Sequence, residues 1–194
     1  MYSGLSNVVD KSRPHLGGNL DFGDPYTYSP TVWEYLIKRF SLHSALDLGS
    51  GTGHAAHYFS ESGVKCIAVD GLEDNILSAI YPTIKIDLTE SPVFCKVDLV
   101  HCQEVVEHIE PIYVHNIINS FKSGNIVCMT HAFPGQGGHH HVNEQPTQYW
   151  VDLLTKNNFS LLMEDTKRIR EMANRDGATY LAKSGLVFAN NNKH

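Results

Sequence analysis

Short runs that are apolar on both faces recur along the chain and are separated by stretches with helical spacing. The runs fall near residues 44–48, 65–69, 84–88, 97–102 and 125–130. Such runs are typical of strands in a parallel sheet, because both faces of that sheet are covered. Another strand is expected near 160–164 and a hairpin-like pair near 179–189, with the charged segment 167–175 between them.

Apolar residues at helical spacing occupy most of the gaps between the strands. The expected helices cover residues 30–40, 52–62, 72–81, 111–122 and 146–156. Ser29-Pro30 supplies a cap and a first-turn proline for the first helix, and Gly63, Pro82 and Gly124 mark three helix ends. This alternation predicts a doubly wound, mostly parallel α/β sheet with helices on both faces and right-handed crossovers.

The length of 194 residues fits one domain. We expect an irregular arm or lid over 1–28, a single domain over 29–189 and a frayed tail over 190–194. The first thirty residues show no apolar run, and no stretch reaches the ~18 apolar residues of a membrane helix. The four scattered cysteines are typical of buried free thiols in a reducing compartment. A cytoplasmic protein with no membrane partner is expected.

Charge argues against a nucleic-acid partner. The chain has 15 basic and 21 acidic side chains, a formal charge of -6 with histidine neutral. Such a chain is poorly suited to hold a phosphate backbone by charge. Its 12 histidines include the consecutive run His139–His141.

The most informative stretch is a strand that runs into three alternating glycines, Gly49, Gly51 and Gly53, and then a helix. Glycine permits a tight turn and close approach of a ligand, and the helix N-terminus adds unpaired N–H groups. Two ligands fit this pattern. A dinucleotide is one, since Asp70 lies 19 residues beyond Gly51. The other carries a positive ammonium and sulfonium, which the Asp47 carboxylate would attract while repelling a pyrophosphate.

Four segments resemble, in order, the motifs of class I S-adenosylmethionine-dependent methyltransferases. They are the glycine loop 46–53, the second strand end 68–71, the loop 86–88 and the fourth-strand motif 98–109, which ends in Glu-His. The resemblance covers roughly residues 30–165 and implies S-adenosylmethionine as the cofactor. In this family the acid after the second strand holds the ribose hydroxyls and the acid after the third meets the adenine amino group. The implied cofactor site consists of Asp47, Gly49, Ser50, Gly51, Gly53, Asp70, Gly71, Asp87, Leu88, Cys102 and Gln103.

The methyl acceptor is expected at the carboxyl ends of the strands, under the polar loop 131–146 and the arm around 24–28. His108 and His131 are the candidate bases for an alcohol acceptor, since histidine titrates near neutral pH. The expected acceptor contacts are Tyr26, Tyr28, His139, His141 and Asn143. No metal is assigned, although His139 and His141 with His131 or Glu144 form an alternative metal set.

These features predict methyl transfer to a small-molecule or sugar-like acceptor, at oxygen, by in-line displacement. The segment after the fourth strand lacks the Asp/Asn-Pro-Pro-aromatic motif of nucleic-acid amino-methyltransferases, which again argues against a nucleic-acid acceptor. Two alternatives stay open: an NAD(P)-dependent oxidoreductase and a non-catalytic S-adenosylmethionine-binding protein.

Overall fold

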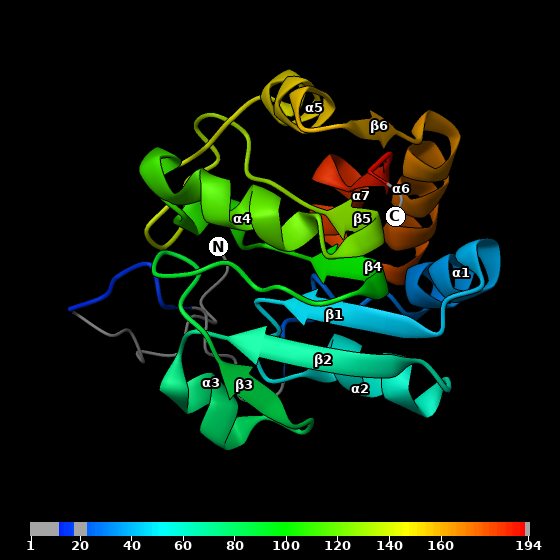
Figure 1. The fold of residues 1–194 in the computed structure, drawn as a ribbon, viewed down its shortest axis with the longest axis horizontal. Helices are drawn as coiled ribbons and strands as arrows, with labels where there is room; N and C mark the ends of the chain where they lie inside the picture. Colours follow the sequence, from blue (N-terminus) through cyan, green and yellow to red (C-terminus); the bar gives the residue numbers. More distant parts are fainter. Residues whose placement is uncertain (1–11, 18–22, 193–194) are drawn as a thin grey trace.

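The computed structural model describes residues 12–17 and 23–192 and contains a seven-stranded sheet in the order β3-β2-β1-β4-β5-β7-β6 (Figure 1). β7 is antiparallel to both of its neighbours, and the other pairs are parallel. The strands are β1 Ser44–Leu48, β2 Lys65–Asp70, β3 Thr83–Lys85, β4 Val97–Cys102, β5 Gly124–Met129, β6 Phe159–Leu161 and β7 Leu186–Asn190. The predicted doubly wound, mostly parallel sheet is confirmed.

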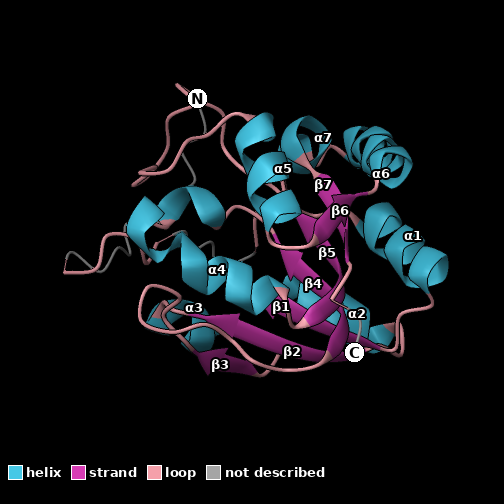
Figure 2. Cartoon of the chain, turned by 45° about the horizontal axis from the view of Figure 1, so that its top comes forward, coloured by secondary structure: helices cyan, strands magenta, loops and turns pink. Residues whose placement is uncertain are grey.

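Helices cover both faces of the sheet (Figure 2). They are α1 Pro30–Phe40, α2 His54–Glu61, α3 Glu73–Ser78, α4 Val114–Phe121, α5 Thr147–Lys156, α6 Met163–Asp176 and α7 Thr179–Ser184. Side chains of α4 and α5 form one apolar core with the sheet, and side chains of α1, α2, α6 and α7 form the other. On β4 the neighbours Leu99 and Val100 belong to different cores, which explains why the strand is apolar on both faces.

The prediction of a hairpin over 179–189 was wrong. Residues Thr179–Ser184 form α7, and only Leu186–Asn190 are a strand. The charged segment before it belongs to the long helix α6, whose Ile169 and Ala173 are buried while its other faces carry the charges. Gly177, in the left-handed conformation, ends α6 and allows the chain to turn directly into α7.

Two other boundaries differ from the predictions. β3 ends at Lys85 because the carboxylate of Asp87 accepts the backbone N–H and the hydroxyl of Thr89, which turns the chain away from the sheet. At the carboxyl end, Asn190 belongs to β7, and the N–H of Asn191 donates to the carbonyl of Asn158. The expected tail therefore begins later than 190, and residues 193–194 lie outside the described part.

Two composition-based expectations can be compared with the structure. All four cysteines are free, with Cys102 and Cys128 buried and Cys66 and Cys95 partly buried. Within residues 12–17 and 23–192, none of the helices has the length and apolarity needed to cross a membrane.

The start of β1 is held to β4 by the Asp98 carboxylate. It accepts the backbone N–H groups of His43 and Ser44, each at 2.9 Å, and the Ser44 hydroxyl at 3.0 Å. Partial burial alone would raise the pKa of Asp98, but these hydrogen bonds outweigh it and lower the pKa. The ionised form therefore stabilises the fold above the unfolded pKa of ~3.9, and this contribution is lost as pH falls through the lower folded value.

We expect Asp98→Ala to lower the free energy of unfolding by about 1–2 kcal/mol at pH 7, the range for hydrogen bonds to a partly exposed charge. Urea denaturation from pH 7 down toward pH 3 measures this difference, which should shrink with pH. Asp152→Ala, at an exposed site on α5, is the control. A difference that does not change with pH would contradict this role of the charge.

Candidate active site

A cavity of about 1160 Å³ opens at the carboxyl ends of the parallel strands. It exceeds the ~300–1,000 Å³ of ordinary ligand sites, so it has room for a cofactor and a small acceptor together. Most of the predicted cofactor residues line it: Asp47, Gly49, Ser50, Gly51, Asp70, Gly71, Asp87, Leu88 and Gln103. Gly53 and Cys102 do not line it, because Gly53 caps α2 and the Cys102 side chain is in the core beneath α4 and α5.

The glycine loop is held in shape by β2. The N–H groups of Gly49 and Ser50 both donate to the Val69 carbonyl at 2.9 Å. Gly49 has φ +74°, and a Cβ there would lie 2.3 Å from Cγ2 of Val105. Gly51 has φ +55°, but a Cβ there would meet nothing within 4 Å. The first glycine is therefore required by packing, whereas the second borders open cavity.

Asp70 connects the glycine loop to the start of α3. Its carboxylate accepts the N–H of Gly51 at 2.8 Å and the N–H of Leu72 at 2.9 Å. Burial raises the pKa of Asp70, and the hydrogen bonds oppose that rise. Two other polar atoms of the cavity wall, Ser50 Oγ and Gln103 Nε2, are buried and have no hydrogen-bond partner among the described residues. Buried groups of this kind are suited to a bound ligand.

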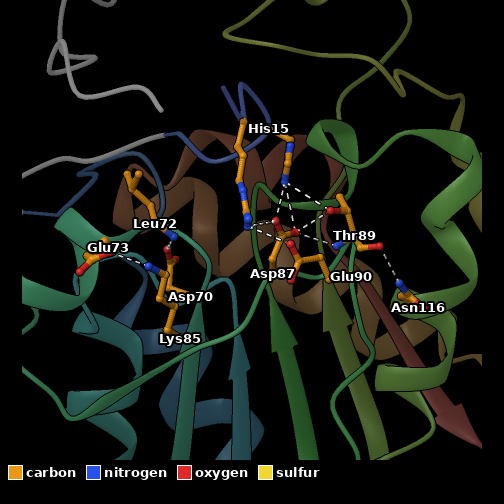
Figure 3. Close-up of polar contacts among 10 residues, drawn as sticks. His15, Asp70, Leu72, Glu73, Lys85, Asp87, Thr89, Glu90 and Asn116 are labelled. Carbon is orange, nitrogen blue, oxygen red and sulfur yellow. Dashed lines mark hydrogen bonds and ion pairs between the residues drawn. The ribbon is translucent and has the colours of Figure 1, made fainter. Parts of the chain in front are cut away.

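The described part of the N-terminal arm reaches Asp87 (Figure 3). The carboxylate of Asp87 lies 2.9 Å from Nε2 of His15 and 3.2 Å from Nη1 of Arg13. Burial alone would raise the pKa of Asp87, but hydrogen bonds from Thr89 and His15 outweigh it and lower the pKa. Nε2 of His139 lies 3.0 Å from the Pro14 carbonyl oxygen. Residues 12–17 thus contact the predicted adenine-binding acid and the predicted acceptor loop.

A second group of side chains lies after β4. One ligand atom each of Glu107, His108 and His141 falls within 4.8 Å of the others, a spacing that suits a single metal ion. Glu107 is fully buried, and its carboxyl group interacts with that of Glu104. The Glu107 carbonyl accepts the N–H groups of Val142 and Asn143 at 3.0 Å, which places His141 beside His108.

Burial dominates the electrostatics of this group. It raises the pKa of Glu107 well above its ordinary value and that of the adjacent Glu104 to about 7. Burial and the neighbouring histidines, His141 foremost, lower the pKa of His108 to about 4. Glu104 is clamped by Thr130, whose hydroxyl donates to Glu104 Oε1 at 2.7 Å and accepts the Glu104 N–H at 2.8 Å. Two carboxylates and two histidines therefore meet in a poorly solvated place.

The structure brings some of the predicted acceptor residues to the cavity and leaves others outside. His108, His139, His141 and Tyr28 line it. His131 does not, because it is 1% exposed and its ring nitrogens lie 3.1 Å from Thr147 Oγ1 and 3.3 Å from the Ala132 carbonyl. Asn143 is also 1% exposed and donates to the Val106 carbonyl at 3.3 Å. Tyr26 packs edge-on against Tyr180, outside the cavity lining.

Several cavity residues were not predicted from the sequence. They include His15, Trp33, His101, Glu104 and Tyr180. Glu107, which does not line the cavity but belongs to the set with His108 and His141, was not predicted either. The spacing Glu-x-x-Glu-His over 104–108 is the one sequence signal that could have pointed to the metal-type set. The other residues come together only through the fold.

Comparison with known proteins agrees with this geometry. The family described as "Methyltransferase domain" matches residues 25–183, and the chain belongs to it. This confirms the predicted class, a class I methyltransferase with S-adenosylmethionine as cofactor, and decides against the nicotinamide alternative.

A curated relative and two solved structures illustrate the similarity. A ubiquinone biosynthesis O-methyltransferase of Rickettsia canadensis is 27% identical over 57% of this chain and 54% of its own length. The chain thus matches about half the length of that relative. The [4+2]-cyclase SpnF has a TM-score of 0.57 at 14% identity, covering 83% of this chain and 80% of SpnF. Magnesium protoporphyrin IX methyltransferase from Synechocystis PCC 6803, with bound SAM, has a TM-score of 0.54 at 16% identity, covering 68% and 69%.

Proposed function

We propose that this chain transfers a methyl group from S-adenosylmethionine to an oxygen of a small-molecule acceptor, assisted by a divalent cation at Glu107, His108 and His141. The observation that carries this proposal is the grouping itself, in which one ligand atom each of the fully buried Glu107, of His108 and of His141 falls within 4.8 Å of the others. Ionising a buried carboxyl group beside a second one is costly, and a cation bound by it and by two imidazoles offsets that cost. Glu104 stands next to this set on the cavity wall.

The cofactor end of the cavity is assigned from the loop geometry. Asp70 and Asp87 lie on the side of β2 and β3, which suits the ribose and adenine, and Asp47 lies below the glycine loop, which suits the ammonium group. Arg13 and His15 would cap the adenine end from above, so residues 12–17 serve as the lid. With the cofactor held by these residues, Glu104 and His108 would remain on the cavity wall for the acceptor.

The chemistry needs alignment more than a strong base. The C–S bond of the sulfonium breaks as the O–CH₃ bond forms, the sulfur keeps the electron pair, and the hydroxyl proton leaves to solvent. Holding the two reactants in line is worth ~7–11 kcal/mol. A divalent cation in the site would lower the pKa of a bound hydroxyl and so supply the nucleophile near neutral pH. His131, a candidate base from the sequence, has no role in this scheme, because its ring hydrogen-bonds with Thr147 and does not line the cavity.

An oxygen acceptor is supported by two further points. The curated relatives are named O-methyltransferases. The cavity wall carries Glu104, His108 and Tyr28, which can orient hydroxyl groups by hydrogen bonding. The proposed acceptor is therefore a small or sugar-like molecule that carries hydroxyl groups.

The test incubates the chain with methyl-labelled S-adenosylmethionine and a panel of polyhydroxylated, amine and thiol acceptors. Each reaction contains Mg²⁺, Mn²⁺, Zn²⁺ or a chelator. We expect label on oxygen only when a cation is present. Label on nitrogen or sulfur, or transfer that the chelator leaves unchanged, would overturn the proposal. Cofactor binding without transfer across the panel would favour a non-catalytic binding protein.

A further inference from the structure

Beneath the glycine loop, three buried side chains from three elements form a hydrogen-bonded row. Trp33 of α1 lies with its Nε1 3.2 Å from Nε2 of His101 on β4. Nδ1 of the same ring lies 2.7 Å from Oδ1 of Asp47 on β1. The three residues are 2%, 2% and 3% exposed in that order, so water does not compete for these bonds.

The direction of donation along this row follows from the chemistry of tryptophan. An indole N–H can only donate, so Nε2 of His101 must accept and carries no proton. The remaining proton of the neutral ring is then on Nδ1, which donates to Asp47. Trp33 thereby selects one tautomer of His101, and that tautomer holds one oxygen of Asp47.

The negative charge of the Asp47 carboxylate is therefore not neutralised by His101. A neutral histidine satisfies Oδ1 by a hydrogen bond but does not cancel the negative charge. Oδ2 is buried and has no hydrogen-bond partner among residues 12–17 and 23–192, and Asp47 lines the cavity. Asp176, another acid of the cavity wall, already accepts the hydroxyls of Ser29 and Thr31. Asp47 is thus an oriented acceptor prepared for a cation.

We infer that Trp33 and His101 are positioning residues that hold Asp47 so that its free oxygen receives the ammonium group of the cofactor. This inference rests on the cofactor placement proposed above and is independent of the acceptor and of the metal. Neither residue touches the cofactor in this scheme. Substituting them should therefore lower the affinity only for ligands that carry the amino-acid part of the cofactor.

That restriction provides the test. S-adenosylhomocysteine contains the ammonium group, whereas 5′-methylthioadenosine has the same nucleoside without the amino-acid part. Calorimetry measures both affinities for the wild-type chain, His101→Gln, His101→Asn and Trp33→Phe. The amide nitrogen of asparagine superposes on Nδ1 of histidine and keeps the bond to Asp47, whereas that of glutamine superposes on Nε2 and loses it.

We expect His101→Gln to weaken S-adenosylhomocysteine binding about 10- to 100-fold, by analogy with partners that orient metal-binding side chains. Affinity for 5′-methylthioadenosine should stay within about threefold. His101→Asn should recover most of the lost affinity. Trp33→Phe, which keeps an aromatic ring in the core, should show a smaller loss with the same selectivity, and it decides the question if His101→Gln does not fold.

Equal weakening of both ligands would show that the row is merely structural and overturn the inference. Unchanged S-adenosylhomocysteine binding in His101→Gln and Trp33→Phe would overturn it as well. If the wild-type chain binds neither ligand, the proposed cofactor site itself fails, and the inference fails with it. The wild-type measurement therefore separates the two failures.

Discussion

Replacing Glu107 by glutamine is expected to reduce methyl transfer at least ~10²-fold, because the substitution removes the only charged ligand from the set Glu107, His108 and His141. Cofactor affinity should stay the same, since Glu107 does not line the cavity. The free energy of unfolding should not fall, because the lost group is a fully buried carboxyl whose ionised form is costly at that place. The substitution is thus expected to lower activity without lowering stability.

Two measurements check this expectation. Turnover is compared with Mg²⁺, Mn²⁺, Zn²⁺ or a chelator, and thermal unfolding is compared with and without each cation. A cation that binds only the folded chain raises Tm for the wild type and not for Glu107→Gln. The matched control is Glu110→Gln, an exposed glutamate three positions further on. A cation-dependent rise in Tm that survives in Glu107→Gln would place the metal elsewhere.

Replacing Gly51 by alanine is expected to weaken S-adenosylhomocysteine binding ~10²-fold or more while leaving the chain folded. A Cβ at Gly51 meets no protein atom within 4 Å, so the fold loses only the ~1–2 kcal/mol of a left-handed alanine. The same Cβ projects where the cofactor must approach the loop backbone. The loss of affinity is therefore steric and does not depend on a charged group.

Gly63 offers a matched control for the backbone strain. Its φ is +82° and a Cβ there also meets nothing within 4 Å, but Gly63 lies at the far end of α2 and does not line the cavity. Gly63→Ala should reduce the free energy of unfolding by a similar amount and leave the affinity intact. Equal affinities for the Gly51→Ala and wild-type chains would remove the glycine loop from the cofactor site.

The fold was predictable wherever burial produces a recognisable hydrophobic pattern in the local sequence. β4 lies between two apolar cores, so Leu99 and Val100 are both apolar and the strand could be predicted without its partners. The segment 179–184 has no such hydrophobic pattern. It is a six-residue helix between Gly177 and Gly185, and its apolar residues are too few to separate helical from alternating spacing.

The residues of the candidate site likewise fall into two groups, those predictable from local sequence and those that only the fold brings together. The glycine loop and Asp70 are close in sequence and belong to recognisable motifs, so they could be placed before the structure was known. His141 reaches Glu107 through backbone hydrogen bonds from a loop more than thirty residues away, which no local pattern records. His131 shows the converse, because it follows β5 where a base was expected and yet its ring lies against Thr147.

The left-handed backbone at Glu104 has a cost that the rest of the site must offset. Its φ of +54° is strained by ~1–2 kcal/mol for a residue with a Cβ and would be relaxed by glycine. Selection for thermal robustness alone would thus favour glycine at this position, and selection for catalysis would favour the carboxylate. In the proposed scheme, Glu104 is therefore a position at which stability is given up for activity.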